Sequence, residues 1–285
     1  MDADGFHLEY DRVGAGPSVV LLHGWPGDRT DYAEVVPLLT SHSVVVPDLR
    51  GFGTSSKPSA SSKLVADPVE QYGVDGQARS IIGLIEGLGL DRPILGGYDI
   101  GSRIAQGVAR LRPDLVRRLV VTPPLPGVGA RVLNPDSQRE FWYQYFHRLD
   151  LAEELIDGRP VAVRAYLRHF WNHWSGPSFT VSPERLDHLV SVYSPPGAYV
   201  ASINWYRAGP GATTRYLAER EPDPADRLGV PTTALWPSHD PLFPRAWSDR
   251  LGEYFTDVLV QPVDGVGHFV PVEAPSQFAA ALAAP

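Results

Sequence analysis

Short, continuous apolar runs alternate with amphipathic stretches in the first and last parts of the chain. The runs are rich in β-branched residues and cover Ser18–Leu22, Ser43–Val46, Arg92–Gly97, Arg118–Val121, Val230–Trp236 and Val258–Val260. Such runs are typical of strands that are buried on both faces, as in a parallel sheet. Two stretches between them, Gln77–Leu88 and Ser102–Leu111, carry apolar residues at helical spacing. This alternation predicts an α/β fold with a mostly parallel central sheet flanked by helices.

The middle third of the chain lacks strand-like runs and is rich in aromatic residues. Helical patterns cover Gln138–Leu149, Ala162–Trp174 and Ser182–Tyr193. The strand and helix alternation then returns and ends in a short helix near Ser276–Leu282. We therefore expect a core made of residues 1–124 and 215–285, with a helical cap of residues 125–214 inserted between its halves. An aromatic cap over the edge of a sheet would enclose a mostly apolar pocket.

Composition and charge narrow the class of protein. The 285 residues include 25 Lys and Arg against 33 Asp and Glu, so the formal net charge is −8. This acidic balance disfavours nucleic acid or an anionic membrane as a partner, and no stretch reaches the roughly 18–20 apolar residues of a membrane span. The first residues are acidic and lack the basic region that opens a signal peptide, so we expect a cytoplasmic protein. The absence of cysteine removes thiolate nucleophiles and Cys-ligated metals.

The strongest chemical signal follows the third predicted strand, where Gly97–Ser102 reads Gly-Tyr-Asp-Ile-Gly-Ser. Small residues on both sides of Asp99 are typical of the sharp strand-to-helix turn called a nucleophile elbow, with Asp at the position that Ser usually occupies. The alternative is an ordinary glycine-rich turn with a solvated Asp. A carboxylate, with a pKa near 3.9 in short peptides, is ionised at neutral pH without a base. It is suited to attack an alkyl carbon of an epoxide, haloalkane or haloacid, giving an ester that water can hydrolyse.

Hydrolysis of such an ester requires a base, an acid that orients the base, and an oxyanion hole. His268 follows the last predicted strand, which is where the chain order nucleophile, acid, His places the base. Asp240 follows the strand before it and is the predicted acid. Trp25 lies in the loop after the first predicted strand, so the backbone amides of Trp25 and Ile100 are the predicted oxyanion hole.

Taken together, these segments resemble the α/β-hydrolase superfamily and, within it, the epoxide hydrolase branch. The resemblance spans nearly the whole chain, through His23–Pro26, Asp48–Ser55, the Asp elbow, Asp240 and His268. Members of this branch use two cap tyrosines to hold and protonate the epoxide oxygen. The matching motifs here are Tyr143-Gln144-Tyr145-Phe146 and Asn204-Trp205-Tyr206-Arg207. The resemblance therefore implies this role for Tyr143 and Tyr206, whose phenols stay protonated at neutral pH and can donate a proton.

Departures from the branch keep an alternative open. Tyr98 and Ile100 flank the nucleophile where the branch usually has His and Trp. Haloalkane dehalogenases hold halide with that Trp and with an Asn that is Trp25 here. Fluoroacetate-type dehalogenases place Arg directly after the nucleophile and a His-Trp pair in the cap, where this chain has Ile100 and Tyr143-Gln144, although Arg103 matches a second arginine of that group. Dehalogenation is the alternative, and a non-catalytic ligand-binding homologue is a third hypothesis.

The resulting expectation is an epoxide hydrolase that forms a vicinal diol through an ester on Asp99. The reactants are a small hydrophobic, uncharged epoxide and water, and no cofactor or metal is expected. The arginines are expected on solvated faces. The oligomeric state is left open. The predicted substrate-binding residues are Trp25, Tyr98, Trp142 and Gln144.

Overall fold

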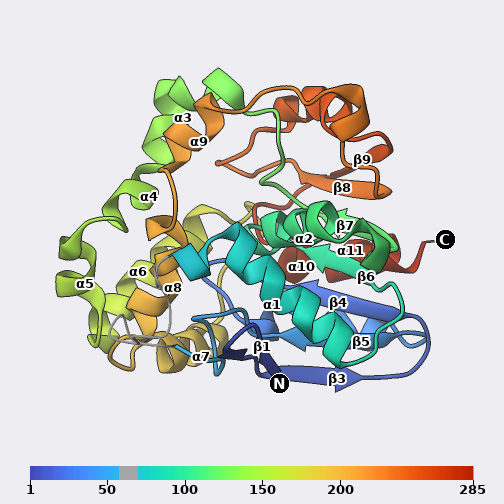
Figure 1. Cartoon of the computed structure of the whole chain (residues 1–285). Helices are drawn as coiled ribbons and strands as arrows, with labels where there is room; N and C mark the ends of the chain where they lie inside the picture. Colours follow the sequence, from blue (N-terminus) through green and yellow to red (C-terminus); the bar gives the residue numbers. More distant parts are fainter. Residues whose placement is uncertain (58–69, 285) are drawn as a thin grey trace.

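A seven-stranded sheet forms the centre of the computed structural model, which describes residues 1–57 and 70–284 (Figure 1). β3 pairs antiparallel with β5, and all other neighbours in the sheet are parallel. In spatial order the strands are β3 (Tyr10–Val13), β5 (Ser43–Pro47), β4 (Ser18–Leu22), β6 (Ile94–Gly97), β7 (Arg118–Val121), β8 (Thr232–Pro237) and β9 (Val258–Val263).

All six predicted apolar runs form strands of this sheet, so the predicted α/β fold with a mostly parallel sheet is confirmed. β3 was not predicted because its sequence, Tyr-Asp-Arg-Val, is mostly exposed and polar. It lies at the edge of the sheet, where only one side is paired and one face need not be buried. A separate two-stranded hairpin is formed by β1 (Asp2–Ala3) and β2 (Phe6–His7).

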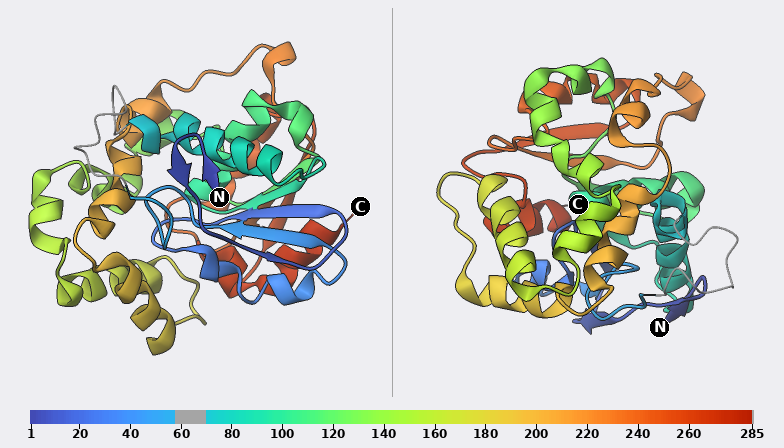
Figure 2. Two further views of the ribbon diagram at one scale, coloured as in Figure 1. Left: turned by 60° about the horizontal axis from the view of Figure 1, so that its bottom comes forward. Right: turned by 90° about the vertical axis from the view of Figure 1, so that its left-hand side faces the viewer.

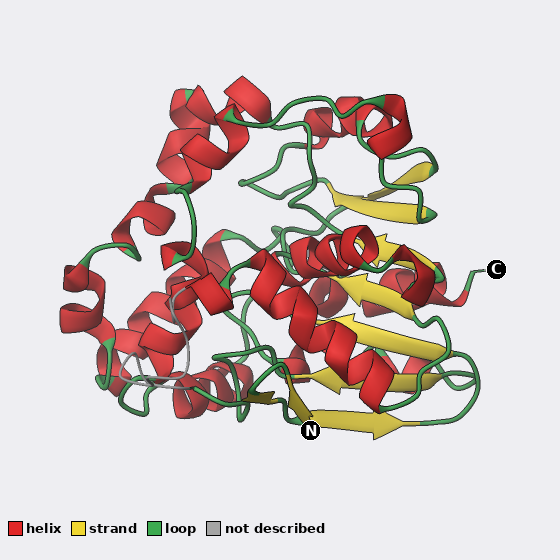
Figure 3. Cartoon of the chain, viewed as in Figure 1, coloured by secondary structure: helices red, strands yellow, loops and turns green. Residues whose placement is uncertain are grey.

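Helices cover both faces of the sheet. On one face α2 packs against β6 and β4, and α1 packs against α2, while on the other α11 packs against β7 and the turn Val36–Leu38 (Figures 1 and 3). Nine of the twelve residues of α2 are buried, because the helix packs against the sheet on one side and against α1 on another. The bounds are α1 (Val74–Gly87), α2 (Ile100–Leu111), α10 (Val270–Glu273) and α11 (Pro275–Ala283).

A group of helices follows β7 in the chain and precedes β8. Figure 1 shows it on the left, beyond the ends to which the parallel strands point, and the right-hand view of Figure 2 looks onto it. No helix of the described residues is both long and apolar enough to cross a membrane. The helices are α3 (Pro135–Glu140), α4 (Trp142–Phe146), α5 (Asp150–Ile156), α6 (Pro160–His173), α7 (Pro183–Tyr193), α8 (Ala198–Arg207) and α9 (Ala212–Leu217).

One helix prediction in this group was wrong. The stretch predicted as a single helix, Gln138–Leu149, is divided at Phe141, which ends α3 and precedes α4. Phe141 is only 1% exposed, and its ring contacts Tyr216 and Phe243 at centroid distances of 6.0 and 5.6 Å. Burial of this ring favours the break, and the helical pattern alone could not reveal contacts with residues so far along the chain.

Glycines allow β6, α2 and the loop after β4 to approach closely. A Cβ on Gly97 would lie 2.6 Å from the carbonyl carbon of Gly101, and a Cβ on Gly101 would lie 2.0 Å from the carbonyl oxygen of Leu22. A Cβ on Gly24 would lie 2.6 Å from the Cβ of Asp99. Because the backbones are in contact at these glycines, the turn between β6 and α2 has little room to move. The glycines therefore fix the position of Asp99, which lies in this turn.

We predict that Gly101→Ala destabilises the protein and displaces Asp99. The added methyl group would overlap backbone atoms rather than a movable side chain, and overpacking of this kind costs about 1–3 kcal/mol. The free energy of unfolding, measured by urea titration, tests this expectation. Gly252→Ala is the matched control, because a Cβ there meets nothing within 4 Å; equal stability of the two variants would contradict the prediction.

Candidate active site

Asp99 occupies the turn between β6 and α2 in a strained backbone conformation. Its φ of 50° lies in the left-handed region, which a non-glycine residue adopts only where the surroundings enforce it. The side chain is 5% exposed, and the backbone N–H of Trp25 donates a hydrogen bond of 2.8 Å to its Oδ1. The turn therefore holds a buried carboxylate at the start of α2, where the helix dipole favours a negative charge.

His268 and Asp240 complete a row of three buried side chains. The His268 Nε2 lies 3.3 Å from Asp99 Oδ2, and its Nδ1 lies 2.8 Å from Asp240 Oδ2. The other oxygen of Asp240 accepts the N–H of Leu242 at 2.8 Å, which fixes the carboxylate. Asp240 follows β8 and His268 follows β9, so the parallel strands bring residues far apart in the sequence to one edge of the sheet.

The two carboxylates control the charge of the histidine. Burial alone would lower the pKa of His268, but the charges of and hydrogen bonds to Asp240 and Asp99 outweigh it and raise the pKa. The carboxylates on its two sides therefore favour the protonated imidazole. Any change that neutralises one of the carboxylates lowers the pKa of His268.

Two backbone amides border the Asp99 carboxylate. The N–H of Trp25 already donates to Oδ1. Ile100 is the first residue of α2, so its N–H belongs to the helix turn that has no intrahelical acceptor. The two amides predicted as an oxyanion hole thus belong to the segments on either side of the carboxylate.

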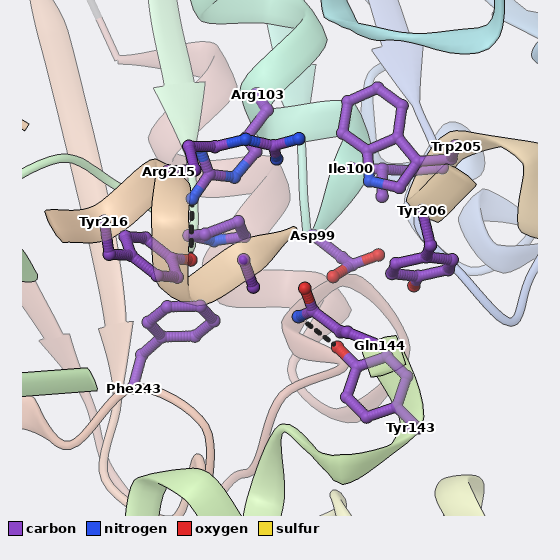
Figure 4. A pocket seen from close by; sticks show the side chains of 12 residues that line it. Asp99, Ile100, Arg103, Tyr143, Gln144, Trp205, Tyr206, Arg215, Tyr216 and Phe243 are labelled. Carbon is purple, nitrogen blue, oxygen red and sulfur yellow. Dashed lines mark hydrogen bonds between the residues drawn. The ribbon is translucent and has the colours of Figure 1, made fainter. Parts of the chain in front are cut away.

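Two tyrosines from the middle helices line the same pocket as Asp99 (Figure 4). Tyr143 lies on α4 and Tyr206 on α8; they are 1% and 7% exposed, and their ring centroids are 5.5 Å apart. Gln144 Nε2 donates a hydrogen bond of 3.0 Å to the Tyr143 hydroxyl. The Tyr206 hydroxyl is buried and has no hydrogen-bond partner among the described residues. Burial, with the charge of Asp99, raises the pKa of both phenols, so both remain proton donors.

Of the predicted substrate-binding residues, only Gln144 lines this pocket. Trp142 is 42% exposed and stacks on Phe170, on the outer side of its helix. On α4 the pocket is lined by Tyr143 and Gln144, whereas Trp142 is turned toward Phe170. Tyr98 is fully buried and its hydroxyl donates to Asp31 Oδ2 at 2.5 Å, while the Trp25 ring stacks on Tyr143. Trp142, Tyr98 and the Trp25 side chain therefore lie outside the pocket lining.

The pocket also contains arginines, although the arginines were expected on solvated faces. Arg103 and Arg215 line it beside Asp99, with Tyr216 and Phe243 (Figure 4). Arg103 lies one helical turn after the nucleophile, a spacing that could have identified it as a pocket residue. Arg215 lies on α9, a helix that the sequence pattern did not reveal, so no such signal was available for it.

A further unpredicted residue, Glu273, supports the loop that carries His268. Its Oε2 accepts the N–H groups of Gly176 at 2.7 Å and Gly267 at 2.9 Å, and its Oε1 accepts that of Phe269 at 3.0 Å. The N–H of His268 itself donates to Trp174 O at 2.7 Å. One carboxylate thus joins the histidine loop to the segment that follows α6.

Among the described residues there is no group of three or more His, Asp or Glu side chains that could hold a metal ion. His169 and His173, one turn apart on α6, stack on each other at 5.5 Å, and His173 Nε2 lies 2.7 Å from Glu140 Oε2. These imidazoles therefore contribute to packing and hydrogen bonding on the surface of α6.

Comparison with known proteins assigns the chain to a family. The family model described as "alpha/beta hydrolase fold" matches residues 17–275. The chain is 30% identical to the soluble epoxide hydrolase of Corynebacterium sp. (strain C12) over 95% of this chain and 91% of that protein. It is 32% identical to the fluoroacetate dehalogenase of a Burkholderia species over 69% of this chain and 64% of that one. The chain therefore belongs to the α/β-hydrolase family.

Solved structures agree with this assignment. The structure of the epoxide hydrolase CorEH without ligand superposes with a TM-score of 0.78 at 28% identity, over 98% of this chain and 94% of that one. Together with the sequence relatives, this likeness indicates a hydrolase that resembles epoxide hydrolases.

Two ion pairs join α7 to the loop that follows β4. His188 Nε2 lies 2.6 Å from Asp28 Oδ2, and Arg185 Nη1 lies 2.7 Å from Asp31 Oδ1. Asp31 also accepts the hydroxyl of Tyr98, the residue before the nucleophile. Despite burial, the hydrogen bond to His188 and neighbouring charges lower the pKa of Asp28 to about 2, and the hydrogen bond to Asp28 raises the pKa of His188. The charged His188–Asp28 pair therefore stabilises the attachment of α7 in a limited pH range.

We predict that His188→Gln destabilises the protein more at pH 5 than at pH 9. The raised pKa of His188 stabilises the fold below about pH 6.5, and this contribution is lost as pH rises through the folded-state pKa. The contribution of Asp28 is present above about pH 4 and is lost as the pH falls toward 2. Because the His188 side chain is 39% exposed, we expect a difference between the two pH values of a few tenths to about 1 kcal/mol.

Urea titrations at both pH values measure this difference. His239→Gln is the control, because His239 is exposed. A loss of stability in His188→Gln that is the same at pH 5 and pH 9 would show that the ion pair does not contribute.

Proposed function

We propose that this protein hydrolyses an epoxide to a vicinal diol through a covalent ester on Asp99. The carrying observation is that one pocket combines a buried carboxylate with two buried phenols, one of which has no hydrogen-bond partner in the described chain. Leaving a buried hydroxyl unpaired costs about 1–3 kcal/mol. An epoxide oxygen bound at Tyr206 would satisfy this donor, with the ring carbons facing Asp99.

In the first step Asp99 Oδ2 attacks an epoxide carbon and the carbon–oxygen bond of the ring breaks. The oxygen that leaves takes a proton from Tyr206 or Tyr143, giving a hydroxyalkyl ester and a phenolate. The choice of Oδ2 follows from the contacts, since Oδ1 is held by the Trp25 amide. The raised pKa of both phenols keeps them protonated until this moment.

The second step depends on the charge of His268. Forming the ester removes the negative charge of Asp99, so the pKa of His268 falls and its proton can return to the phenolate. The neutral imidazole, oriented by Asp240, then takes a proton from water, and the resulting hydroxide attacks the ester carbonyl. The amides of Trp25 and Ile100 stabilise the oxyanion. When the intermediate collapses, the imidazolium protonates the departing diol oxygen, and the proton of the resulting Asp99 carboxylic acid passes to His268, which restores the carboxylate and the imidazolium.

Residues 125–214 act as the cap in this proposal. Five of its residues line the pocket with Asp99: Tyr143, Gln144, Trp205, Tyr206 and Ala212. The cap contacts the core close to the site, since Trp171 Nε1 donates to Pro26 O at 2.9 Å. This arrangement supports a site that is assembled between the cap and the carboxyl edge of the sheet, inside a core of residues 1–124 and 215–285.

Dehalogenation is the second candidate, and one observation favours it. The indole N–H groups of Trp25 and Trp174 are buried without a hydrogen-bond partner in the described chain, and the two rings are 6.0 Å apart. Both rings also contact Tyr143. Unpaired indole donors in contact with the Tyr143 ring would suit a halide that leaves a carbon attacked by Asp99, although neither indole belongs to the pocket lining.

We predict that a His268→Gln variant mixed with an epoxide gains the mass of the epoxide. The ester still forms, but the base that hydrolyses it is absent. Intact-protein mass spectrometry and peptide mapping measure the gain and assign it to Asp99. Asp99→Asn in the same background is the control and should gain no mass. Mass gain only with haloalkanes or haloacids, with halide release, would reject the epoxide in favour of dehalogenation.

We predict that Tyr206→Phe slows formation of this adduct by roughly 100-fold, the usual size of general-acid assistance. The variant removes the hydroxyl and keeps the ring that packs against Tyr143 and Trp25. Rapid-mixing mass spectrometry in the His268→Gln background measures the rate. Tyr145→Phe is the matched control, because that ring is 47% exposed and lies outside the pocket. Equal rates in the two variants would remove Tyr206 from the proposed chemistry.

A further inference from the structure

Two guanidinium groups share the pocket with the nucleophile. Arg103 comes from α2 of the core and Arg215 from α9, and in Figure 4 both lie on one side of Asp99, with the tyrosine pair on the other. Both side chains are partly buried. They are close enough for the charge of Arg103 to act on Arg215, so two like charges from different parts of the chain meet beside the carboxylate.

Neither arginine forms an ion pair with a described carboxylate. Arg103 Nη2 donates to the Tyr216 hydroxyl at 2.6 Å, and its guanidinium lies 5.2 Å from the centre of that ring. The guanidinium of Arg215 donates to no group among the described residues. The acid that acts on Arg103, Glu219, instead accepts the N–H of Gly129 at 2.9 Å.

Two other arginines with little exposure do pair with carboxylates. Arg50, fully buried, pairs with Asp4 at 2.5 Å, and Arg185 pairs with Asp31. Burial and the neighbouring charge of Arg103 lower the pKa of Arg215 to about 10. Two like charges that are removed from water repel each other unless an anion lies beside them. The pocket is the space from which such an anion could reach both guanidinium groups.

We propose that the substrate is a small epoxide that carries a carboxylate, and that Arg103 and Arg215 bind this carboxylate. The proposal rests on the proposed function and names the substrate class for the same site. A guanidinium presents a planar fork of N–H groups that matches a carboxylate. With the carboxylate at the arginines and the epoxide oxygen at Tyr206, the ring carbons would lie between them, facing Asp99. The product would be a dihydroxy acid.

The charge of the pocket agrees with this substrate. The cavity volume is about 20 Å³, room for about one water molecule, so side chains of the lining must move to admit any substrate. The arginines also offset the repulsion that Asp99 would exert on an anionic substrate. This replaces the uncharged substrate expected from the net charge with an anionic one.

Glycidate and glycidamide provide the test, because they have similar shapes and differ in charge. We expect the wild-type enzyme to favour glycidate, measured as the ratio of the two kcat/KM values. Arg215→Gln and Arg103→Gln should each lower that ratio by roughly 10- to 100-fold, the usual effect of one charged hydrogen-bonding partner. Arg139→Gln is the control, since its side chain is 73% exposed on α3, and it should leave the ratio unchanged. A wild-type ratio near one, or a ratio that the pocket variants do not change, would overturn the proposal.

Binding of propionate, an unreactive carboxylate, separates this proposal from the proposed function. Isothermal titration calorimetry should detect binding to the wild-type protein and at least tenfold weaker binding to Arg215→Gln, with circular dichroism confirming that the variant folds. If Arg215→Gln does not fold, Arg215→Lys replaces it in the experiment. This variant keeps the positive charge but lacks the planar N–H groups of the guanidinium, so it should also bind propionate more weakly. If no epoxide reacts but propionate binding depends on Arg215, the epoxide chemistry fails and the anion site stands. If epoxides react and propionate does not bind, the anion site fails alone.

Discussion

The contact of β6 with α2 at the nucleophile turn is the constraint on which the site depends. The small residues Gly97 and Gly101 let the two backbones touch, and Asp99 between them is forced to a positive φ. A less sharp turn would place the carboxylate among the strands or over the helix. Here it stands at the start of α2 and within reach of a loop amide, so one backbone feature sets the position and the burial of the Asp99 carboxylate.

Electrostatic balance is the second property that connects the parts of the site. Three cationic groups, His268, Arg103 and Arg215, surround or adjoin two carboxylates, Asp99 and Asp240, in a chain whose net charge is −8. The site is therefore locally positive inside an acidic protein. In the proposed mechanism, loss of the Asp99 charge on ester formation changes this balance, and His268 responds because its Nε2 lies 3.3 Å from Asp99 Oδ2.

Much of the fold and part of the site followed from sequence patterns. The buried strands were readable because each is a continuous apolar run, and Asp99, Asp240 and His268 were placed by their positions after three of these strands. The exposed edge strand, the break at Phe141 and the helix of Arg215 were not readable, because each depends on partners far along the chain. Trp142 was expected at the site from its place in the motif, but only Tyr143 and Gln144 of that stretch line the pocket. Tyr143 and Tyr206 came from motif resemblance, and the structure adds that they line one pocket.

Glu273 gives the architecture a mechanical consequence. Its three hydrogen bonds join the histidine loop to the segment after α6, and the His268 amide is bonded to the same segment. His268 is therefore coupled to this end of the helical layer, and a displacement of the segment after α6 would also displace the imidazole from Asp99.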